Sequence, residues 1–229
     1  MKRVKVTLIG SKSDLIQPLL NTAQQNNLEV QCINRNDWDL ENPIIPELVL
    51  ENILTFQPDS LLFAAGANKP ISLCEPLSEI VSRIETHISI NCTSFISFSI
   101  AVQQVLRKPL KSIHAISSLY GTYGRRTRLP YSVSKHALEG AIKCLATEYK
   151  DTQVLGYRPG FFSTTLTARN LSKDSQMALI KKIPVERFGL PEEISRIITQ
   201  NILNPSPYMT GVCLTIDGGM RAGGFFDVK

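Results

Sequence analysis

Residues 112–138 read SIHAISSLYGTYGRRTRLPYSVSKHAL and carry the most informative residues of the chain. Within this stretch, Tyr131 and Lys135 stand four residues apart, so they share one face of a helix. A nearby ammonium favours the charged form of a phenol and lowers a pKa that is otherwise about 10. Such a pair can serve as general acid and base for a carbonyl or an alcohol near neutral pH. Ser118, thirteen residues before Tyr131, adds a hydroxyl to the same candidate site.

Strand-like and helix-like segments alternate along the whole chain. β-rich apolar runs predict strands over Val4–Ile9, Leu28–Ile33, Ser60–Ala65, Ser112–Ser117, Gln153–Tyr157 and Val212–Ile216. Apolar residues at helical spacing predict helices over Leu15–Asn26, Pro46–Phe56, Ser132–Tyr149, Glu192–Leu203 and Leu77–Leu106, the last with one break near Glu85–Ser89. This alternation predicts an α/β fold, a doubly wound parallel sheet with helices on both faces. In such sheets, ligands bind beyond the carboxyl ends of the strands.

Length and composition favour one domain over residues 1–229. The hydrophobic fraction of 43% is enough for a substantial core. The net charge of +5 favours anionic small molecules, but it is too diffuse to predict a nucleic-acid partner. The densest basic cluster, Arg125-Arg126-x-Arg128, is either a solvated loop or an anion contact at the mouth of the site.

Cysteine and histidine usage predicts neither disulfides nor a metal site. The five cysteines form no Cys-x-x-Cys pair, so we expect buried, reduced thiols in a cytoplasmic protein; they are Cys32, Cys74, Cys92, Cys144 and Cys213. The three histidines are scattered, without the spacing of metal ligands. The apolar run at the start of the chain is too short for a signal peptide, and we expect no apolar stretch long enough to span a membrane.

Further segments accompany this candidate site along nearly the whole chain. They are Ala64-Ala65-Gly66 after an apolar strand, Asn91 in the next helix, Pro159-Gly160-x-x-x-Thr164, Arg187-Phe-Gly189-x-Pro191-Glu192-Glu193-Ile194, Tyr208-Met-Thr210-Gly211 and Ile216-Asp217-Gly218-Gly219. In this order and at these spacings, together with Ser118, Tyr131 and Lys135, they resemble the short-chain dehydrogenase/reductase family. The resemblance implies a single-domain Rossmann-like fold and hydride transfer between a nicotinamide dinucleotide and a carbonyl or secondary alcohol.

The resemblance also implies a role for each catalytic candidate. Tyr131 would donate or accept the proton of the substrate oxygen, and Lys135 would lower the pKa of Tyr131 and bind the nicotinamide ribose. Ser118 would hold the substrate oxygen, and Asn91 would hold a water that links Lys135 to solvent. Each residue alone also has a structural interpretation: a turn serine, a helix-kink asparagine, a packed tyrosine and a solvated lysine.

The first loop departs from the family pattern Gly-x-x-x-Gly-x-Gly, in which glycines make a tight turn and let the backbone approach a pyrophosphate. The loop reads Gly10-Ser-Lys-Ser-Asp14-Leu-Ile16, so only the first glycine is kept. The Asp14 carboxylate would repel a phosphate, unless Asp14 or Ser13 caps the following helix. Ile16 adds bulk where helix and strand pack closely. A dinucleotide would therefore bind in a shifted pose, bind weakly or not bind at all.

Other residues favour a retained cofactor site. Asn34-Arg35 ends the second strand, where a family member that prefers NAD usually has an acidic residue, and Arg35 can pair with a 2′-phosphate, which predicts NADP over NAD. Asp39-Leu40 resembles the family's adenine contact, whereas Ala64 replaces an asparagine that usually ties the strand ends together. The predicted cofactor-binding residues are Gly10, Ser11, Lys12, Ser13, Leu15, Asn34, Arg35, Asp39, Leu40, Ala64, Ala65, Gly66, Tyr131, Lys135, Pro159, Gly160 and Thr164.

The leading prediction is an NADP(H)-dependent oxidoreductase of a small-molecule carbonyl or secondary alcohol, with Asn91, Ser118, Tyr131 and Lys135 as catalytic residues. Two alternatives remain: a non-catalytic binding or regulatory module, favoured by the lost glycines, and non-redox acid–base chemistry by Tyr131. An aromatic and cationic pocket would suit an anionic or sugar-like substrate; its candidates are Leu119, Tyr120, Tyr123, Arg125, Arg126, Leu129, Phe161 and Phe162. Residues 161–185 form either a substrate lid or an ordinary helical insertion. The resemblance implies a homodimer or homotetramer.

Overall fold

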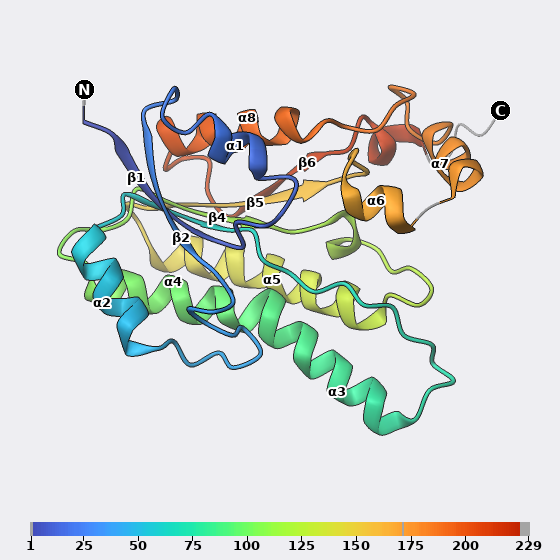
Figure 1. The fold of residues 1–229 in the computed structure, drawn as a ribbon, viewed down its shortest axis with the longest axis horizontal. Coiled ribbons are helices and arrows are strands. Elements are labelled where there is room, and N and C mark those ends of the chain that lie inside the picture. Colours follow the sequence, from blue (N-terminus) through green and yellow to red (C-terminus); the bar gives the residue numbers. More distant parts are fainter. Residues whose placement is uncertain (1, 171, 225–229) are drawn as a thin grey trace.

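The computed structural model describes residues 2–170 and 172–224, which contain a six-stranded parallel sheet (Figure 1). The strands are β1 (Val4–Ile9), β2 (Leu28–Ile33), β3 (Ser60–Phe63), β4 (Ser112–Ile116), β5 (Gln153–Pro159) and β6 (Val212–Ile216). Their order across the sheet is β2-β1-β3-β4-β5-β6. The chain therefore leaves β1 first toward one edge and then toward the other, which confirms the predicted doubly wound arrangement.

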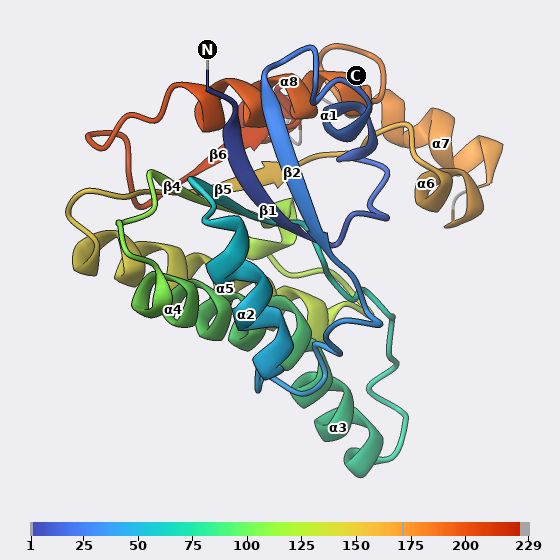
Figure 2. The same ribbon diagram turned by 60° about the vertical axis from the view of Figure 1, so that its left-hand side comes forward.

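Helices cover both faces of the sheet (Figures 1 and 2). One face carries α1 (Gln17–Asn21) and α8 (Pro191–Leu203), and the opposite face carries α2 (Glu47–Phe56), α3 (Leu77–Ile88), α4 (Ser94–Val105) and α5 (Leu129–Glu148). Residues 161–185, which the sequence left open as a substrate lid or an ordinary insertion, include α6 (Thr165–Asn170) and α7 (Lys173–Ile180). These two helices lie at the end of the molecule where the carboxyl ends of β5 and β6 lie (Figure 1).

The apolar core has one cluster on each face of the sheet. Phe95 from α4 and Leu138 from α5 pack against one face, and Ile194 and Ile198 from α8 pack against the other. All four residues of the central strand β3 are buried, as expected for a parallel strand that is covered on both sides. This double burial explains why β3 reads as a continuous apolar run in the sequence.

The register of the strands brings their carboxyl ends to one edge of the sheet. Ile9 at the end of β1 pairs with Ile33 of β2 and with Phe63 of β3. Pro159 at the end of β5 pairs with Ile216 of β6. The loops that leave these ends therefore open on the same edge, and they carry Gly10, Asn34, Ala64, Ser118 and Gly160. This is where the sequence predicted the ligand site.

The first helix is much shorter than the predicted Leu15–Asn26. Two tight turns replace its first residues, because the Ser13 N–H donates to the Gly10 carbonyl (3.1 Å) and the Ile16 N–H donates to the Ser13 carbonyl (2.9 Å). After Asn21 the helix ends where Thr22 Oγ1 donates back to the Pro18 carbonyl (2.7 Å). The apolar residues that suggested a longer helix are still buried, Ile16 at the end of the turns and Leu19 within α1.

The other element boundaries differ from the predictions by a few residues. The break in the long helix is a π-helical turn at Ser89–Thr93, somewhat later than the predicted Glu85–Ser89, and the Ser94 N–H donates to the Ser89 carbonyl across it. β3 ends at Phe63 rather than Ala65. α5 begins at Leu129 rather than Ser132, because Pro130 suits the first turn of a helix.

Two further expectations are corrected. The five cysteines are free, but Cys32, Cys74 and Cys144 are exposed rather than buried. Cys32 lies on the edge strand β2, Cys74 lies in a turn before α3, and Cys144 lies on the solvent side of α5. The helical run Leu77–Val105 is long and apolar enough, by length and composition alone, to cross a membrane, although we expected no such stretch. The same run packs onto the sheet through Phe95 and other buried residues, and buried core helices satisfy that criterion too.

Candidate active site

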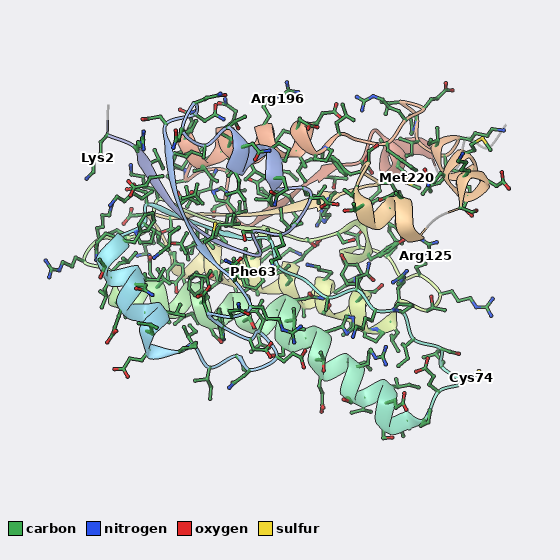
Figure 3. All side chains as sticks on the ribbon, viewed as in Figure 1. Lys2, Phe63, Cys74, Arg125, Arg196 and Met220 are labelled. Carbon is green, nitrogen blue, oxygen red and sulfur yellow. The ribbon has the colours of Figure 1, made fainter. Side chains whose placement is uncertain are left out.

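Two neighbouring cavities lie along the carboxyl edge of the sheet. The inner cavity, about 710 Å³, is lined by Ser118, Tyr131 and Lys135 among others. The outer cavity, about 790 Å³, lies between the loop after β2 and α3. Both are lined by Gly10, Lys12, Ala65 and Gly66, so they meet at the first loop. Figure 3 shows Arg125, which lines the inner cavity, at the end of the molecule where α6 and α7 lie.

Gly10 is required where the cavities meet. Its φ of +89° belongs to the left-handed region, and a Cβ at this position would lie 2.4 Å from the Ala65 nitrogen. The one glycine kept in the first loop therefore lets the backbone after β1 and the backbone after β3 touch. Ala64 itself donates its N–H to the Ile9 carbonyl (2.8 Å), so the two strand ends are tied together without the asparagine that the family pattern has here.

Tyr131 lies in the first turn of α5 and faces Ser118, which follows β4. The Ser118 Oγ accepts from the Tyr120 N–H (3.2 Å), so this serine is also a turn residue. Burial raises the pKa of Tyr131, against the lowering effect of a hydrogen bond with Ser118. The expectation of a lowered phenol pKa is therefore wrong for the protein as this structure describes it, because loss of hydration outweighs the neighbouring groups.

Lys135 is nearly completely buried, with 3% of its surface exposed. Its Nζ donates to the Ile116 carbonyl (2.8 Å) and lies 5.8 Å from the centre of the Tyr131 ring. Burial lowers the pKa of Lys135 to about 8, and the nearby Cys92 and Glu139 oppose that shift. The lysine is thus not a solvated charge. It is a desolvated amine held against the strand end beside the tyrosine.

Asn91 lies in the π-helical turn and is completely buried. Its Oδ1 accepts from the Ala67 N–H (2.7 Å), and its Nδ2 donates to the Ala67 carbonyl (2.9 Å) and to Ser134 Oγ (2.8 Å). A Cβ on Gly66 would lie 3.1 Å from Asn91 Oδ1 and 3.6 Å from Lys135 Nζ, so Gly66 is the neighbour of both side chains. Asn91 ties the segment after β3 to α5, and its role in holding a water stays a prediction.

Asp14 in the first loop makes contacts that were not expected from the sequence. Asp14 accepts from the backbone N–H of Thr165 (2.7 Å) and from the Thr165 hydroxyl, 151 residues away. The residue that precedes α1 is Ile16, and no side chain caps this helix, so neither Asp14 nor Ser13 is its cap. Ile16 is completely buried in the core cluster under α8 and does not fill the crevice.

We expect Asp14→Ala to free the start of α6 in the ligand-free protein. A hydrogen bond to a charged group contributes about 1.5–3 kcal/mol, so hydrogen exchange at the Thr165 amide should rise by about tenfold or more. Mass spectrometry of peptides from residues 161–170 would measure this exchange. Asp174→Ala, which changes an acidic residue in the first turn of α7, is the matched control and should leave α6 unchanged. Equal exchange in both variants would show that Asp14 does not hold α6.

The predicted residues after β2 and β5 also lie at the cavities. Arg35 lines the outer cavity, is well exposed and pairs with Glu41 (3.2 Å) and Asp39 (3.6 Å). Asn34 accepts from Ser11 Oγ (2.5 Å), and Leu40 lines the outer cavity beside Asp39.

Pro159 at the end of β5, and Gly160 and Thr164 after it, line the inner cavity. A Cβ on Gly160 would lie 2.8 Å from Asp217 Cα, so this glycine permits a close backbone approach. All the predicted site residues therefore lie on the carboxyl edge of the sheet. The predicted catalytic and cofactor-binding residues line one of the two cavities, except Asn91 and Ser11, which support the loops around them. Of the residues predicted for the substrate pocket, Arg126 and Leu129 line neither cavity.

Sequence reasoning missed several lining residues. Trp38, Arg83 and His87 line the outer cavity. Arg128 was not missed: it belongs to the basic cluster that the sequence left open as an anion contact or a solvated loop. It lines the inner cavity and donates to the carbonyl and to Oδ1 of Asn68. Glu139 lies directly behind the inner cavity. Its position four residues after Lys135 was the available signal, because that spacing repeats the face on which Tyr131 and Lys135 lie.

Comparison with known proteins places the chain in a family. A family model described as enoyl-(acyl carrier protein) reductase matches residues 57–221. Carbonyl reductase family member 4 of Xenopus laevis is 34% identical over 166 residues, which make up 71% of this chain and 66% of that protein. The 3-oxoacyl-[acyl-carrier-protein] reductase FabG of Rickettsia typhi is 27% identical over 219 residues, 94% of this chain and 86% of that protein.

Solved structures agree on the fold. A 4-hydroxyisoleucine dehydrogenase complexed with NADH has a TM-score of 0.84 at 22% identity, covering 96% of this chain and 100% of that one. A putative NAD(P)-dependent gluconate 5-dehydrogenase from Beutenbergia cavernae, with bound NADP at low occupancy, has a TM-score of 0.85 at 20% identity, covering 97% and 98%. The chain belongs to the short-chain dehydrogenase/reductase family of oxidoreductases.

The residues between the two cavities fit a nicotinamide dinucleotide, which proteins of this family bind in general. Within the described residues, the backbone N–H groups of Lys12, Asp14 and Leu15 donate to no protein acceptor, so they are free to meet a pyrophosphate. Lys12 lines both cavities and adds a cation. The Asp14 carboxylate is engaged by Thr165 rather than unpaired. Backbone donors and a cation therefore remain beside both cavities despite the departure from the glycine pattern.

Proposed function

We propose that the protein is an NADP(H)-dependent oxidoreductase that acts on a small-molecule carbonyl or secondary alcohol. The observation that carries this proposal is that Ser118, Tyr131 and Lys135 line one cavity, which joins a second, cation-lined cavity at Gly10. Together the two cavities cross the carboxyl edge of the sheet, where a dinucleotide lies in folds of this kind. Bound NADP(H) supplies or accepts the hydride.

The side chains around the inner cavity supply the acid–base part of this chemistry. The raised pKa of Tyr131 keeps its phenol protonated at neutral pH, so the hydroxyl can donate its proton to a carbonyl oxygen as that oxygen gains charge. The Ser118 hydroxyl donates to the same oxygen. Lys135, with a pKa of about 8, is still mainly cationic at pH 7 and stabilises the phenolate that forms.

Residues of the first loop and of the outer cavity would hold the dinucleotide. Lys12 and the free N–H groups around it would meet the pyrophosphate, and Arg35 would meet a 2′-phosphate. The ion pairs of Arg35 with Asp39 and Glu41 are exposed, and such pairs contribute only about 0–1 kcal/mol, so a phosphate can displace them. Pro159, Gly160 and Thr164 would meet the nicotinamide end of the dinucleotide in the inner cavity.

The lining of the inner cavity favours a substrate that carries an anionic or sugar-like group. Arg125 and Arg128 line this cavity together with Tyr120 and Tyr123. Arg125 donates to the Tyr120 hydroxyl and lies 5.8 Å from the centre of its ring. Guanidinium groups that line a cavity bind carboxylates and phosphates through charge-assisted hydrogen bonds. Tyrosine hydroxyls beside them bind polyhydroxy groups through ordinary hydrogen bonds.

We also propose that copies of the chain associate in the cytoplasm. Large apolar side chains are exposed on α3 and on the start of α5, and the two helices pack side by side; they are Leu77, Val81, Leu129 and Val133. Large exposed apolar side chains on two neighbouring helices favour association with a second copy. Sedimentation as a monomer at micromolar concentration would contradict this proposal.

Titration of the intrinsic fluorescence with NADPH and NADH tests the proposed function. Trp38 is the single tryptophan of the chain and lines the outer cavity, so a bound adenosine should quench it. We expect NADPH to bind about tenfold more tightly than NADH, and Arg35→Ala to remove most of this difference, since a guanidinium–phosphate bond is charge-assisted. No quenching by either dinucleotide at millimolar concentration would overturn the proposal and favour a non-catalytic binding or regulatory module.

A further inference from the structure

A buried carboxylate that has no role in the proposed chemistry lies directly behind the inner cavity. Glu139 is on α5, one turn after Lys135, and only 4% of its surface is exposed. It accepts from Ser117 Oγ (2.8 Å), from Arg158 Nε (2.7 Å) and from Arg158 Nη2 (2.6 Å). Arg158 also donates through Nη1 to the Cys213 carbonyl on β6 (3.0 Å). Glu139 therefore joins α5 to the residue after β4 and to β5, and its partner Arg158 extends the link to β6.

Each partner of Glu139 is a chain neighbour of a proposed site residue. Ser117 directly precedes Ser118, and Arg158 directly precedes Pro159 and Gly160. The loop that follows Ser118 closes onto the same carboxylate, because a Cβ on Gly121 would lie 2.4 Å from Glu139 Oε1. A glycine is thus needed at this point for the loop to pack against Glu139.

We infer that Glu139 is a positioning residue of the site: it fixes the ends of β4 and β5, which carry Ser118 and Pro159-Gly160, relative to the turn of α5 that carries Lys135. This inference rests on the proposed function. A bidentate carboxylate–guanidinium pair is directional, so it sets the geometry of the groups it joins as well as contributing energy. A displacement of about 1 Å at reacting groups can cost about 10²-fold in rate.

The negative charge of Glu139 also affects the pKa of Lys135. The groups that face the Lys135 amine are Cys92 from the π-helical turn, and Tyr131 and Glu139 from its own helix. Burial lowers the pKa of Lys135, and the Glu139 carboxylate raises it. Removing this charge while keeping the shape should therefore make Lys135 lose its proton at lower pH.

Glu139→Gln, which keeps the shape, is the test variant, and Asp59→Asn is its matched control. Asp59 is another buried carboxylate that accepts from Lys108 Nζ (2.7 Å) and from the Lys5 N–H (2.9 Å), but it lies at the amino end of β3, away from the site. Both variants remove the charge of a carboxylate that is paired with a cation, although Lys108 is half exposed, and both should lower the unfolding midpoint. Only Glu139→Gln should lower kcat, by about tenfold to 10²-fold, and move the alkaline fall of kcat to lower pH. NADPH affinity, followed through Trp38, should stay within about threefold.

Hydrogen exchange in the ligand-free protein gives a readout that does not depend on activity. In Glu139→Gln, exchange should rise by about tenfold or more in residues 116–122 and 157–163, and in Asp59→Asn it should stay as in the unmodified protein there. Exchange and kcat that respond equally to the two variants would overturn the inference. Failure of the unmodified protein to bind a dinucleotide would instead overturn the proposed function, and the exchange result would then decide the positioning role alone.

Discussion

Tyr131→Phe is expected to lower kcat by about 10³-fold, because the variant keeps the ring and removes the hydroxyl that donates the proton. The ring packs edge-on against Tyr120, with centroids 6.0 Å apart, and phenylalanine preserves this contact. Stability should therefore change little, and NADPH should still quench Trp38. The measurement is the rate of NADPH oxidation with a carbonyl substrate, followed at the absorbance of the reduced nicotinamide.

Tyr149→Phe is the control, because Tyr149 lies at the opposite end of the same helix, outside both cavities. It should leave kcat unchanged. If Tyr131→Phe keeps its activity while NADPH binding is intact, Tyr131 is not the proton donor, and the alternative of a binding or regulatory module gains support. If product forms from the unmodified protein without any change in nicotinamide absorbance, non-redox acid–base chemistry is the better interpretation.

The central part of the parallel sheet could be predicted from the sequence because β3 and β4 are buried at every residue. The edge strands Leu28–Ile33 and Val212–Ile216 are partly exposed, but turn residues bound them, and the structure ends them at the predicted residues. The place of the site followed from the same pattern, since the carboxyl ends of parallel strands meet at one edge. That rule places Ser118 and Gly160 beside each other without any knowledge of the side-chain contacts.

The short α1 shows where local patterns fail. Apolar residues over Leu15–Asn26 have helical spacing, but spacing reports burial. A turn that buries Ile16, followed by a five-residue helix that buries Leu19, produces the same pattern. The prediction that the cysteines are buried fails for a related reason. Cys144 lies on α5 among apolar neighbours in sequence, yet it points away from the face that Leu138 and Ile142 bury.

Contacts between residues that lie far apart in the chain could not be predicted from the sequence. The hydrogen bond between Asp14 and Thr165 spans 151 residues, so the carboxylate was considered only as a helix cap or as a source of repulsion. The pKa of Tyr131 was predicted in the wrong direction because the neighbouring cation is visible in the sequence, whereas the loss of hydration that outweighs it depends on packing.

Acid is expected to destabilise the protein strongly well above the pH at which carboxylates titrate, because of a histidine in the middle of the sheet. His114 on β4 is completely buried, with Nε2 2.8 Å from Ser112 Oγ and Nδ1 3.0 Å from the Tyr157 hydroxyl. Its ring stacks on Tyr157 at 5.9 Å. Burial lowers the pKa of His114 to about 3. The folded protein therefore holds this imidazole neutral.

The sign of the effect follows from comparing the folded and unfolded states. An unfolded histidine has a pKa of about 6.5, so between about pH 6.5 and pH 3 the unfolded chain binds one proton more than the folded chain does at this position. The contribution of His114 is fully present above pH 6.5 and is lost, by about 1.4 kcal/mol per pH unit, as the pH falls toward 3. Burial also lowers the pKa of His87, which adds to the loss in the same direction.

Urea unfolding between pH 7.5 and pH 5 measures this loss. We expect the free energy of unfolding to fall by about 2 kcal/mol over this range from His114 alone. His114→Phe keeps a ring against Tyr157 and removes the titrating group, so most of that slope should disappear even if the variant is less stable at pH 7.5. His136→Asn changes an exposed histidine and should keep the slope. Two results would contradict this expectation: a free energy of unfolding that stays constant from pH 7.5 to pH 5, or a slope that is kept in His114→Phe. Either result would show that the imidazole takes up its proton in the folded state, with Ser112 and Tyr157 as acceptors.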